Sequence, residues 1–256
     1  MPRSGSRPPV SVRPVVAVLI PARNEAEALP GLFVRLDAES VPGLRDIIVV
    51  DNGSTDETAT VAAAAGARVV TEPRPGYGIA CQRGIDALAG DAVMPDVLVF
   101  LDADDYEAPA QIARLVEPIL EDLADMVVGL RRTGKDPGVR WHAALGNRVI
   151  LGALRVLYGD RTTDMGPFRA VRWSNLEALA LDDASYGWYV QMQIRALRSG
   201  CRVSAIPVRF RRRNVGRSKV SGSLRGSLGA GWVMLRTLAV EVLMRSPPYV
   251  DSRSDV

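Results

Sequence analysis

The chain has 256 residues, of which 47% are hydrophobic and 24% are charged, and its formal net charge is +3. These values are typical of one globular domain, and they exclude a disordered, collagen-like or coiled-coil chain. The small net charge implies no particular partner. Two cysteines, Cys81 and Cys201, do not make a disulfide framework, and this favours a reducing, cytoplasmic compartment.

Short apolar runs alternate with helical patterns between residues 14 and 130. The runs lack polar alternation, which is typical of strands that are covered on both faces. The predicted strands are 15–20, 46–50, 68–71, 97–101 and 126–130. The predicted helices are 27–38, 56–65, 78–89 and 109–120. This alternation predicts an α/β fold in which helices flank a mostly parallel sheet.

The pattern in the second half of the chain is less regular. The elements predicted there are helices over 139–157 and 189–199 and strands over 168–172 and 202–210. A further apolar segment, 228–244, contains Arg236 and Glu241 and is shorter than the roughly 20 residues that a membrane span needs. We expect it to form a helix that packs on the core or lies on a membrane surface.

Polar residues directly follow three of the predicted strands. Ligands of open α/β sheets bind beyond the carboxyl ends of the strands, so the segments 21–25, 51–54 and 102–105 should converge on one crevice. Asp102 and Asp104 are two residues apart, and neighbouring carboxylates repel by about 4 kcal/mol at an effective dielectric constant of about 20. A divalent cation relieves this repulsion, and oxygen ligands suit Mg²⁺ or Mn²⁺ bound together with substrate phosphates. The alternative is a solvated turn or a helix cap.

A glycine-rich stretch, Gly76-Tyr77-Gly78, follows the third predicted strand and opens a helix. Backbone N–H groups at such a place can face an anion, although an ordinary turn would use the same residues. The glycine fingerprint of dinucleotide-binding proteins is absent after the first strand, where the residues 21–25 read PARNE. Hydride-transfer chemistry is therefore disfavoured.

The chain is strongly basic from Arg195 to Arg225, where ten residues are Lys or Arg and none is Asp or Glu. Guanidinium groups bind phosphate oxygens in forked pairs, so this stretch favours a phosphate ligand. Nucleic acid is not the expected partner, because aromatic residues are not interleaved beyond Phe210 and no nucleic-acid-binding motif accompanies the run. A solvated basic face is the other interpretation.

Taken together, six segments resemble the family 2 glycosyltransferases with the GT-A fold, in the branch that transfers hexoses to polyprenyl or dolichyl phosphates. The segments are 20–25 (IPARNE), 50–56 (VDNGSTD), 76–78 (GYG), 101–104 (LDAD), 164–169 (DMGPFR) and 216–219 (GRSK). The resemblance implies a GT-A sheet with a smaller antiparallel element in the C-terminal half. It also implies transfer of a hexose from UDP-hexose or GDP-hexose with inversion at the anomeric carbon.

The resemblance assigns roles to individual residues. The substrate-binding residues would be Pro21, Ala22, Asn24, Glu25, Asp51, Gly53, Gly76, Gly78, Asp102, Ala103, Phe168 and Arg169, with Asp51 reaching the base. Asp102 and Asp104 would bind the Mg²⁺ or Mn²⁺ that bridges the diphosphate. The catalytic residues would be Asp164, Arg213, Arg217 and Lys219, the last three on a mobile loop that closes over phosphate groups.

The same resemblance divides the single domain expected over residues 14–245. Residues 14–130 would form the nucleotide-binding half, 131–225 the acceptor half and 226–245 a C-terminal helix. Flexible tails are expected at 1–13 and 246–256, which are rich in Pro, Ser and charge.

The expected acceptor follows from a missing general base. Many relatives have a Glu-Asp pair at the start of the helix predicted here over 189–199, and the corresponding residues are Trp188 and Tyr189. Neither takes a proton at neutral pH, whereas a phosphate monoester, with a second pKa of about 6, needs no base. We therefore expect a polyprenyl phosphate, met at the membrane surface.

Two alternatives stay open at this point. A soluble or polysaccharide hydroxyl could be the acceptor if Asp164, Asp182 or Asp183 served as the base. The chain could also be a non-catalytic protein that binds a nucleotide sugar.

Overall fold

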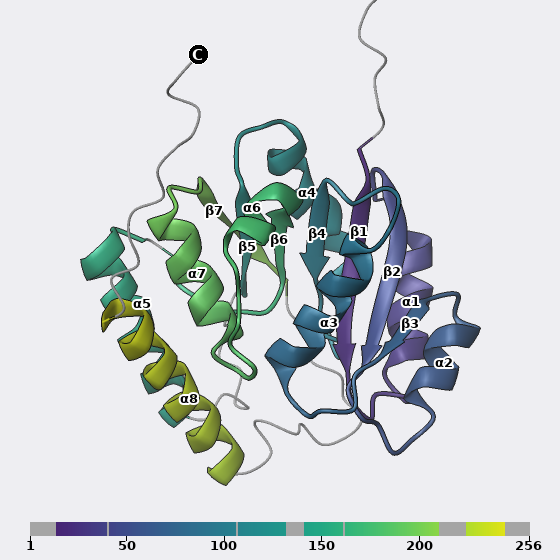
Figure 1. Cartoon of the computed structure of the whole chain (residues 1–256), viewed down its shortest axis with the longest axis horizontal. Helices are drawn as coiled ribbons and strands as arrows, with labels where there is room; N and C mark the ends of the chain where they lie inside the picture. The colour runs from purple at the N-terminus through teal and green to yellow at the C-terminus, as the bar shows by residue number, and fades with distance from the viewer. Residues whose placement is uncertain are drawn as a thin grey trace, which may run out of the picture.

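The computed structural model describes residues 14–39, 41–105, 107–131, 141–160, 162–209 and 224–243. These residues contain a seven-stranded sheet with the strand order β3-β2-β1-β4-β6-β5-β7 (Figure 1). The strands are β1 (Val16–Ala22), β2 (Leu44–Asp51), β3 (Arg68–Thr71), β4 (Val97–Phe100), β5 (Met126–Arg131), β6 (Arg169–Arg172) and β7 (Val203–Val208). All neighbouring strands are parallel except β6, which is antiparallel to β4 and β5. The expected mostly parallel sheet with a smaller antiparallel element is confirmed.

Helices cover both faces of this sheet (Figure 1). One face carries α1 (Leu29–Ala38), α2 (Thr58–Ala64), the short 3-10 helix η1 (Pro109–Gln111) and α4 (Ile112–Leu120). The other carries α3 (Tyr77–Ala89), α5 (Trp141–Tyr158), α6 (Trp173–Ala178), α7 (Trp188–Arg198) and α8 (Leu224–Leu243). In β1, Ala17 and Leu19 belong to the core beneath α3, whereas Val16 and Val18 belong to the core beneath α1. Both faces of the strand are buried, which explains its unbroken apolar sequence.

The predicted elements are present with displaced ends. The helix expected to begin at 226 begins at Leu224, and the strand predicted over 202–210 is the shorter β7. Helix α6 was not predicted, because a helix of six residues is too short to establish a hydrophobic period. The tails expected at 1–13 and 246–256 lie outside the described residues.

The carboxyl ends of β1, β2 and β4 lie at the lower edge of the sheet in Figure 1. Ala22 at the end of β1 is paired with Asp51 at the end of β2, and Asp51 is paired with Thr71 at the end of β3. On the other side of β1, Leu19 is paired with Phe100 of β4. The loops that follow these strands therefore start from one edge, as the sequence predicts.

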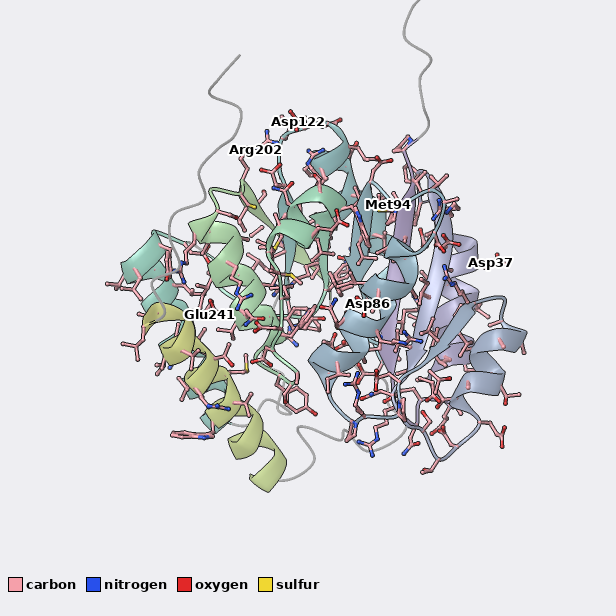
Figure 2. The ribbon with its side chains drawn as sticks, in the orientation of Figure 1. Asp37, Asp86, Met94, Asp122, Arg202 and Glu241 are labelled. Atoms are coloured by element: carbon pink, nitrogen blue, oxygen red, sulfur yellow. The ribbon has the colours of Figure 1, made fainter. Side chains whose placement is uncertain are left out.

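Helix α8 is held to α7 by a carboxylate that is only 3% exposed (Figure 2). The carboxylate belongs to Glu241, whose Oε1 accepts hydrogen bonds from Arg195 Nη2 at 2.7 Å and from Gln191 Nε2 at 2.9 Å. A buried charge is tolerated only when it is paired, so this cluster specifies which side of α8 faces α7. Within the described part of the chain, no helix combines the length and the apolar character needed to cross a bilayer.

Replacement of Glu241 by alanine should destabilise the protein. The change leaves Arg195 and Gln191 without their buried acceptor, and breaking such a pair costs about 3 kcal/mol of unfolding free energy. Urea denaturation measures the loss. The matched control is Glu177→Ala on the exposed side of α6, where a change within about 0.5 kcal/mol is expected. Equal losses in the two variants would contradict the role assigned to Glu241.

Candidate active site

The loops that follow β1 and β2 are joined by hydrogen bonds between side chains and main chain. The N–H of Asn24 donates to Ser54 Oγ at 2.9 Å, and Asn24 Oδ1 accepts from the N–H of Thr55 at 2.6 Å. The N–H of Glu25 donates to Thr58 Oγ1 at 2.8 Å. Asn24 has a φ of 51°, a left-handed conformation that asparagine tolerates better than most residues. Asn24 and Glu25, predicted to bind substrate, thus also fix the shape of the crevice.

The end of β2 is joined in turn to the glycine-rich stretch. Asn52 Nδ2 donates to the carbonyl oxygen of Arg74 at 2.7 Å, and Asn52 Oδ1 accepts from the N–H of Gly76 at 2.9 Å. Asp51 Oδ1 accepts from the N–H of Ser54 at 3.1 Å. Three successive strand-end loops are therefore connected, although no sequence pattern singled out Asn52.

The carboxylate of Asp102 is held by a tyrosine from another element. Tyr77 Oη, on the first residue of α3, donates to Asp102 Oδ1 at 2.9 Å. The hydroxyl of Tyr77 is also hydrogen bonded to the hydroxyl of Tyr189 in α7. Burial and the neighbouring charge of Asp104 raise the pKa of Asp102 to about 7, and the charge of Arg131 opposes this rise.

Asp102 and Asp104 form a donor set suited to a divalent cation. The described residues contain no cluster of three or more Asp, Glu, His or Cys side chains that could hold a metal ion. A cation at Asp102 and Asp104 would therefore need further ligands. Mg²⁺ is commonly bound by one or two carboxylates together with substrate phosphates, and a cation removes the repulsion that raises the pKa of Asp102. The two residues thus fit a metal whose remaining ligands are phosphate oxygens or water.

Asp164 forms a two-point ion pair with an arginine that the sequence did not single out. Arg131 Nε and Nη2 donate to Asp164 Oδ2 and Oδ1 at 2.7 Å and 2.9 Å. Asp164 is only 6% exposed, and Arg131 is the last residue of β5, at the same sheet edge as the other loops. The sequence signal that could have identified Arg131 is its position directly after a predicted strand, at the edge where ligands of such sheets bind. The pair places a positive charge near Asp102.

The other two candidate bases are bound to neighbouring helices. Asp182 Oδ1 accepts from Gln191 Nε2 and from Arg195 Nη2, both at 2.8 Å. Asp183 Oδ2 accepts from Thr237 Oγ1 at 2.7 Å. Both side chains therefore take part in the contacts that hold α7 and α8.

The two glycines of the glycine-rich stretch allow close contact with another loop. A Cβ on Gly78 would lie 1.8 Å from the carbonyl oxygen of Asp183, and one on Gly76 would lie 2.4 Å from that of Ala184. Main-chain packing therefore explains why these positions lack a side chain. Substrate contact at Gly76 and Gly78 stays a prediction.

Arg169 does not reach the surface. It is fully buried, and its guanidinium carbon lies 4.4 Å from the centroid of the Tyr189 ring. Its Nη2 donates to the carbonyl oxygen of Gly166 at 2.8 Å, and burial lowers its pKa to about 10. Arg169 thus packs inside the protein in this structure, and its contact with substrate stays a prediction.

The remaining predicted site residues are distributed as follows. Phe168, Ala103 and Ala22 are buried in the core on the α1 side, whereas Pro21 and Gly53 are partly exposed at the ends of β1 and β2. Arg213, Arg217 and Lys219 lie outside the described residues.

Comparisons with known proteins agree with this geometry. The model of the family "Glycosyl transferase family 2" matches residues 17–180. An uncharacterized glycosyltransferase of Mycobacterium tuberculosis is 40% identical over 213 residues, which are 83% of this chain and 93% of the relative. The undecaprenyl-phosphate mannosyltransferase of Micrococcus luteus is 33% identical over 245 residues, covering 86% of this chain and 97% of the relative.

A solved structure shows the same fold. The glucosyl-3-phosphoglycerate synthase of Mycobacterium tuberculosis, in complex with Mn²⁺, uridine diphosphate and phosphoglyceric acid, superposes with a TM-score of 0.73 and 25% identity. The alignment covers 92% of this chain and 80% of that one. The family match covers more than half of the chain, and the relatives align over most of their length. The chain is therefore a transferase enzyme with the GT-A fold and belongs to glycosyltransferase family 2.

Proposed function

We propose that the protein transfers a hexose from UDP-hexose or GDP-hexose to a polyprenyl phosphate, with inversion at the anomeric carbon. The observation that carries this proposal is the position of Tyr189. Its hydroxyl is hydrogen bonded to the hydroxyl of Tyr77. By the family resemblance, Trp188 and Tyr189 would correspond to the Glu-Asp pair that supplies a general base in many relatives. Burial raises the pKa of both tyrosines well above the usual value, so both phenols are protonated at neutral pH. A protonated phenol cannot serve as a general base. An acceptor that is already an anion fits this site.

The carboxylates nearby support the same conclusion. Asp164 is bound at two points by Arg131, Asp182 by Arg195 and Gln191, and Asp183 by Thr237. Each therefore takes part in structural contacts, and Asp182, with a side chain that is 75% exposed, is the most accessible of the three. The Micrococcus luteus relative, an undecaprenyl-phosphate mannosyltransferase, further supports a polyprenyl phosphate as the acceptor.

In the proposed reaction, an oxygen of the acceptor phosphate attacks the anomeric carbon of the hexose. The bond from that carbon to the diphosphate oxygen breaks, and the nucleoside diphosphate leaves as an anion. Asp102 and Asp104 would hold a divalent cation, which would supply charge neutralisation for this leaving group. Arg131, held by its ion pair with Asp164, would bind a phosphate oxygen.

The rest of the proposed site follows the family resemblance. The nucleotide would lie against Pro21, Ala22, Asn24, Glu25 and Gly53, with Asp51 reaching the base. Arg213, Arg217 and Lys219 would bind phosphate groups of the donor and the acceptor.

A soluble phosphorylated acceptor is the second candidate. The observation in its favour is the similar solved structure, which contains phosphoglyceric acid together with uridine diphosphate and Mn²⁺. In that case the attacking group would be a hydroxyl, and one of Asp164, Asp182 and Asp183 would have to accept its proton.

A direct assay distinguishes the two acceptors. The protein is incubated with Mn²⁺ and radiolabelled UDP-glucose or GDP-mannose, together with either undecaprenyl phosphate or phosphoglycerate. We expect the label to move into the organic phase with the lipid, because the phosphate dianion needs no base. Labelled product only with phosphoglycerate would establish the second candidate. Absence of any transfer, together with absence of donor hydrolysis, would indicate a non-catalytic protein.

Removal of the candidate bases should have little effect on transfer to the lipid phosphate. We expect Asp182→Asn and Asp183→Asn to keep at least about a tenth of the wild-type kcat. We expect Asp164→Asn to act mainly on the acceptor KM, because it disturbs Arg131. A lost general base costs 10² to 10⁴ in kcat. A decrease of that size in kcat alone, at any of the three positions, would contradict a phosphate acceptor.

Tyr77→Phe should weaken metal binding by removing the hydroxyl that positions Asp102. Hydrogen bonds to charged groups are worth about 1.5 kcal/mol or more, so Mn²⁺ affinity in the presence of UDP should fall about tenfold. The electron paramagnetic resonance signal of free Mn²⁺ reports this affinity without turnover. Tyr186→Phe is the matched control, because the Tyr186 ring stacks on Tyr77 at 6.5 Å. Asp104→Asn should abolish binding, and unchanged affinity in Tyr77→Phe would disprove the positioning role.

A further inference from the structure

Exposed apolar side chains are concentrated on two adjacent helices. Of the 11 large hydrophobic residues that are exposed in the described part of the chain, 6 belong to α5 and α8. Three of these are largely exposed: Val156 at 84%, Leu243 at 81% and Trp232 at 70%. Patches of this kind on a soluble domain usually mark a binding surface.

The large exposed side chains of α8 share one side. On α8, Trp232, Arg236 and Leu243 follow the helical period, whereas Leu238 and Glu241 on the opposite side are buried. The two helices pack side by side, with α8 at the lower left of Figure 1. They share one apolar core, so both exposed sides face outward.

Most exposed side chains of α5 are arranged in the same way; Leu157, which is 51% exposed, lies seven residues after buried Ile150 and is not part of this side. Arg148, Arg155 and Val156 are exposed, and Ile150 and Leu154 are buried on the opposite side. We call the exposed sides of both helices the α5–α8 face, defined by Val149, Arg155, Val156, Trp232, Arg236 and Leu243.

The charges on the α5–α8 face have a single sign. Helix α5 contains no Asp or Glu, and the only acid of α8 is Glu241, which is buried against Arg195. Among the residues of the two helices whose side chains the structure describes, the exposed charged ones are therefore arginines: Arg148, Arg155 and Arg236. A surface that combines arginine with tryptophan and aliphatic side chains, without acids, is complementary to anionic lipid headgroups over acyl chains.

A second copy of the chain fits this face less well. The commonest dimers have twofold symmetry, and such an interface applies one patch to itself. Arginine would then face arginine without an acid on the face to compensate. An anionic bilayer instead neutralises the arginines and accepts the apolar groups.

We propose that the α5–α8 face binds the surface of an anionic lipid bilayer. Trp232 and Leu243 enter the headgroup region, and Arg155 and Arg236 lie against lipid phosphates. The inference goes beyond the proposed transfer reaction, because it rests on this face and not on the identity of the acceptor. Lipid binding by the α5–α8 face would determine which side of the enzyme meets the membrane.

Sedimentation with vesicles that lack polyprenyl phosphate tests the proposal. The full chain should bind vesicles in which about a third of the phosphatidylcholine is replaced by phosphatidylglycerol, bind pure phosphatidylcholine weakly, and dissociate at high salt. Trp232→Ser and Arg236→Glu should each lower binding at least about fivefold. The matched controls Leu123→Ser and Arg114→Glu, exposed positions outside the face, should bind as the wild type does. Thermal melting of each variant verifies that it is folded.

Three results would overturn the proposal. The first is unchanged vesicle binding in Trp232→Ser and Arg236→Glu. The second is binding that requires polyprenyl phosphate in the vesicle, which would locate lipid recognition in the active site. The third is a vesicle-free oligomer that Trp232→Ser dissociates, which would assign the face to a second copy. If the protein bound vesicles but transferred no sugar, the result would support lipid binding by the α5–α8 face. It would contradict only the proposed transfer reaction.

Discussion

The hydrogen bond between Tyr77 and Asp102 is the contact on which the organisation of the site depends. It joins the first turn of α3 to the loop that follows β4, and the hydroxyl of Tyr189 extends the connection to α7. A carboxylate that is buried beside a second carboxylate is unfavourable unless hydrogen bonds or a cation compensate. Tyr77 supplies such a hydrogen bond to Asp102. Asp102 and Asp104 together are suited to bind such a cation.

The sequence predicts the sheet well because burial of both faces leaves a simple signature, and it predicts the acids because they follow strands directly. It could not predict what those acids contact. Tyr77 and Tyr189 come from distant parts of the chain, and Arg131 meets Asp164 only because β5 ends at the same edge. Glycine patterns are ambiguous for a related reason. The missing Cβ of Gly78 makes room for the Asp183 main chain, and no sequence pattern separates this from room for a ligand.

Helix α7 contacts both the acids of the candidate site and helix α8. At its first turn, Tyr189 is directed toward Tyr77 and Asp102, while Gln191 bonds to Glu241 of α8 and to Asp182. The same turn therefore connects the acids of the site with the helix that carries part of the α5–α8 face. The hydrogen-bonded side chains of Tyr77, Tyr189 and Gln191 lie between Asp102 and α8.

The distribution of charge follows from the same contacts. In the proposed reaction, Asp102 and Asp104 at the strand ends would bind a cation and thereby a diphosphate, whereas acids would be unfavourable on the α5–α8 face if it binds anionic lipid as proposed. Glu241 is the only acid in α8, and its ion pair with Arg195 directs it inward. That single pair therefore does two things: it specifies which side of α8 packs on α7, and it leaves the opposite side without negative charge. A neutral residue at 241 would also keep the α5–α8 face free of acids, but it would not specify which side of α8 packs on α7. The buried charge therefore contributes to the orientation of α8 as well as to stability.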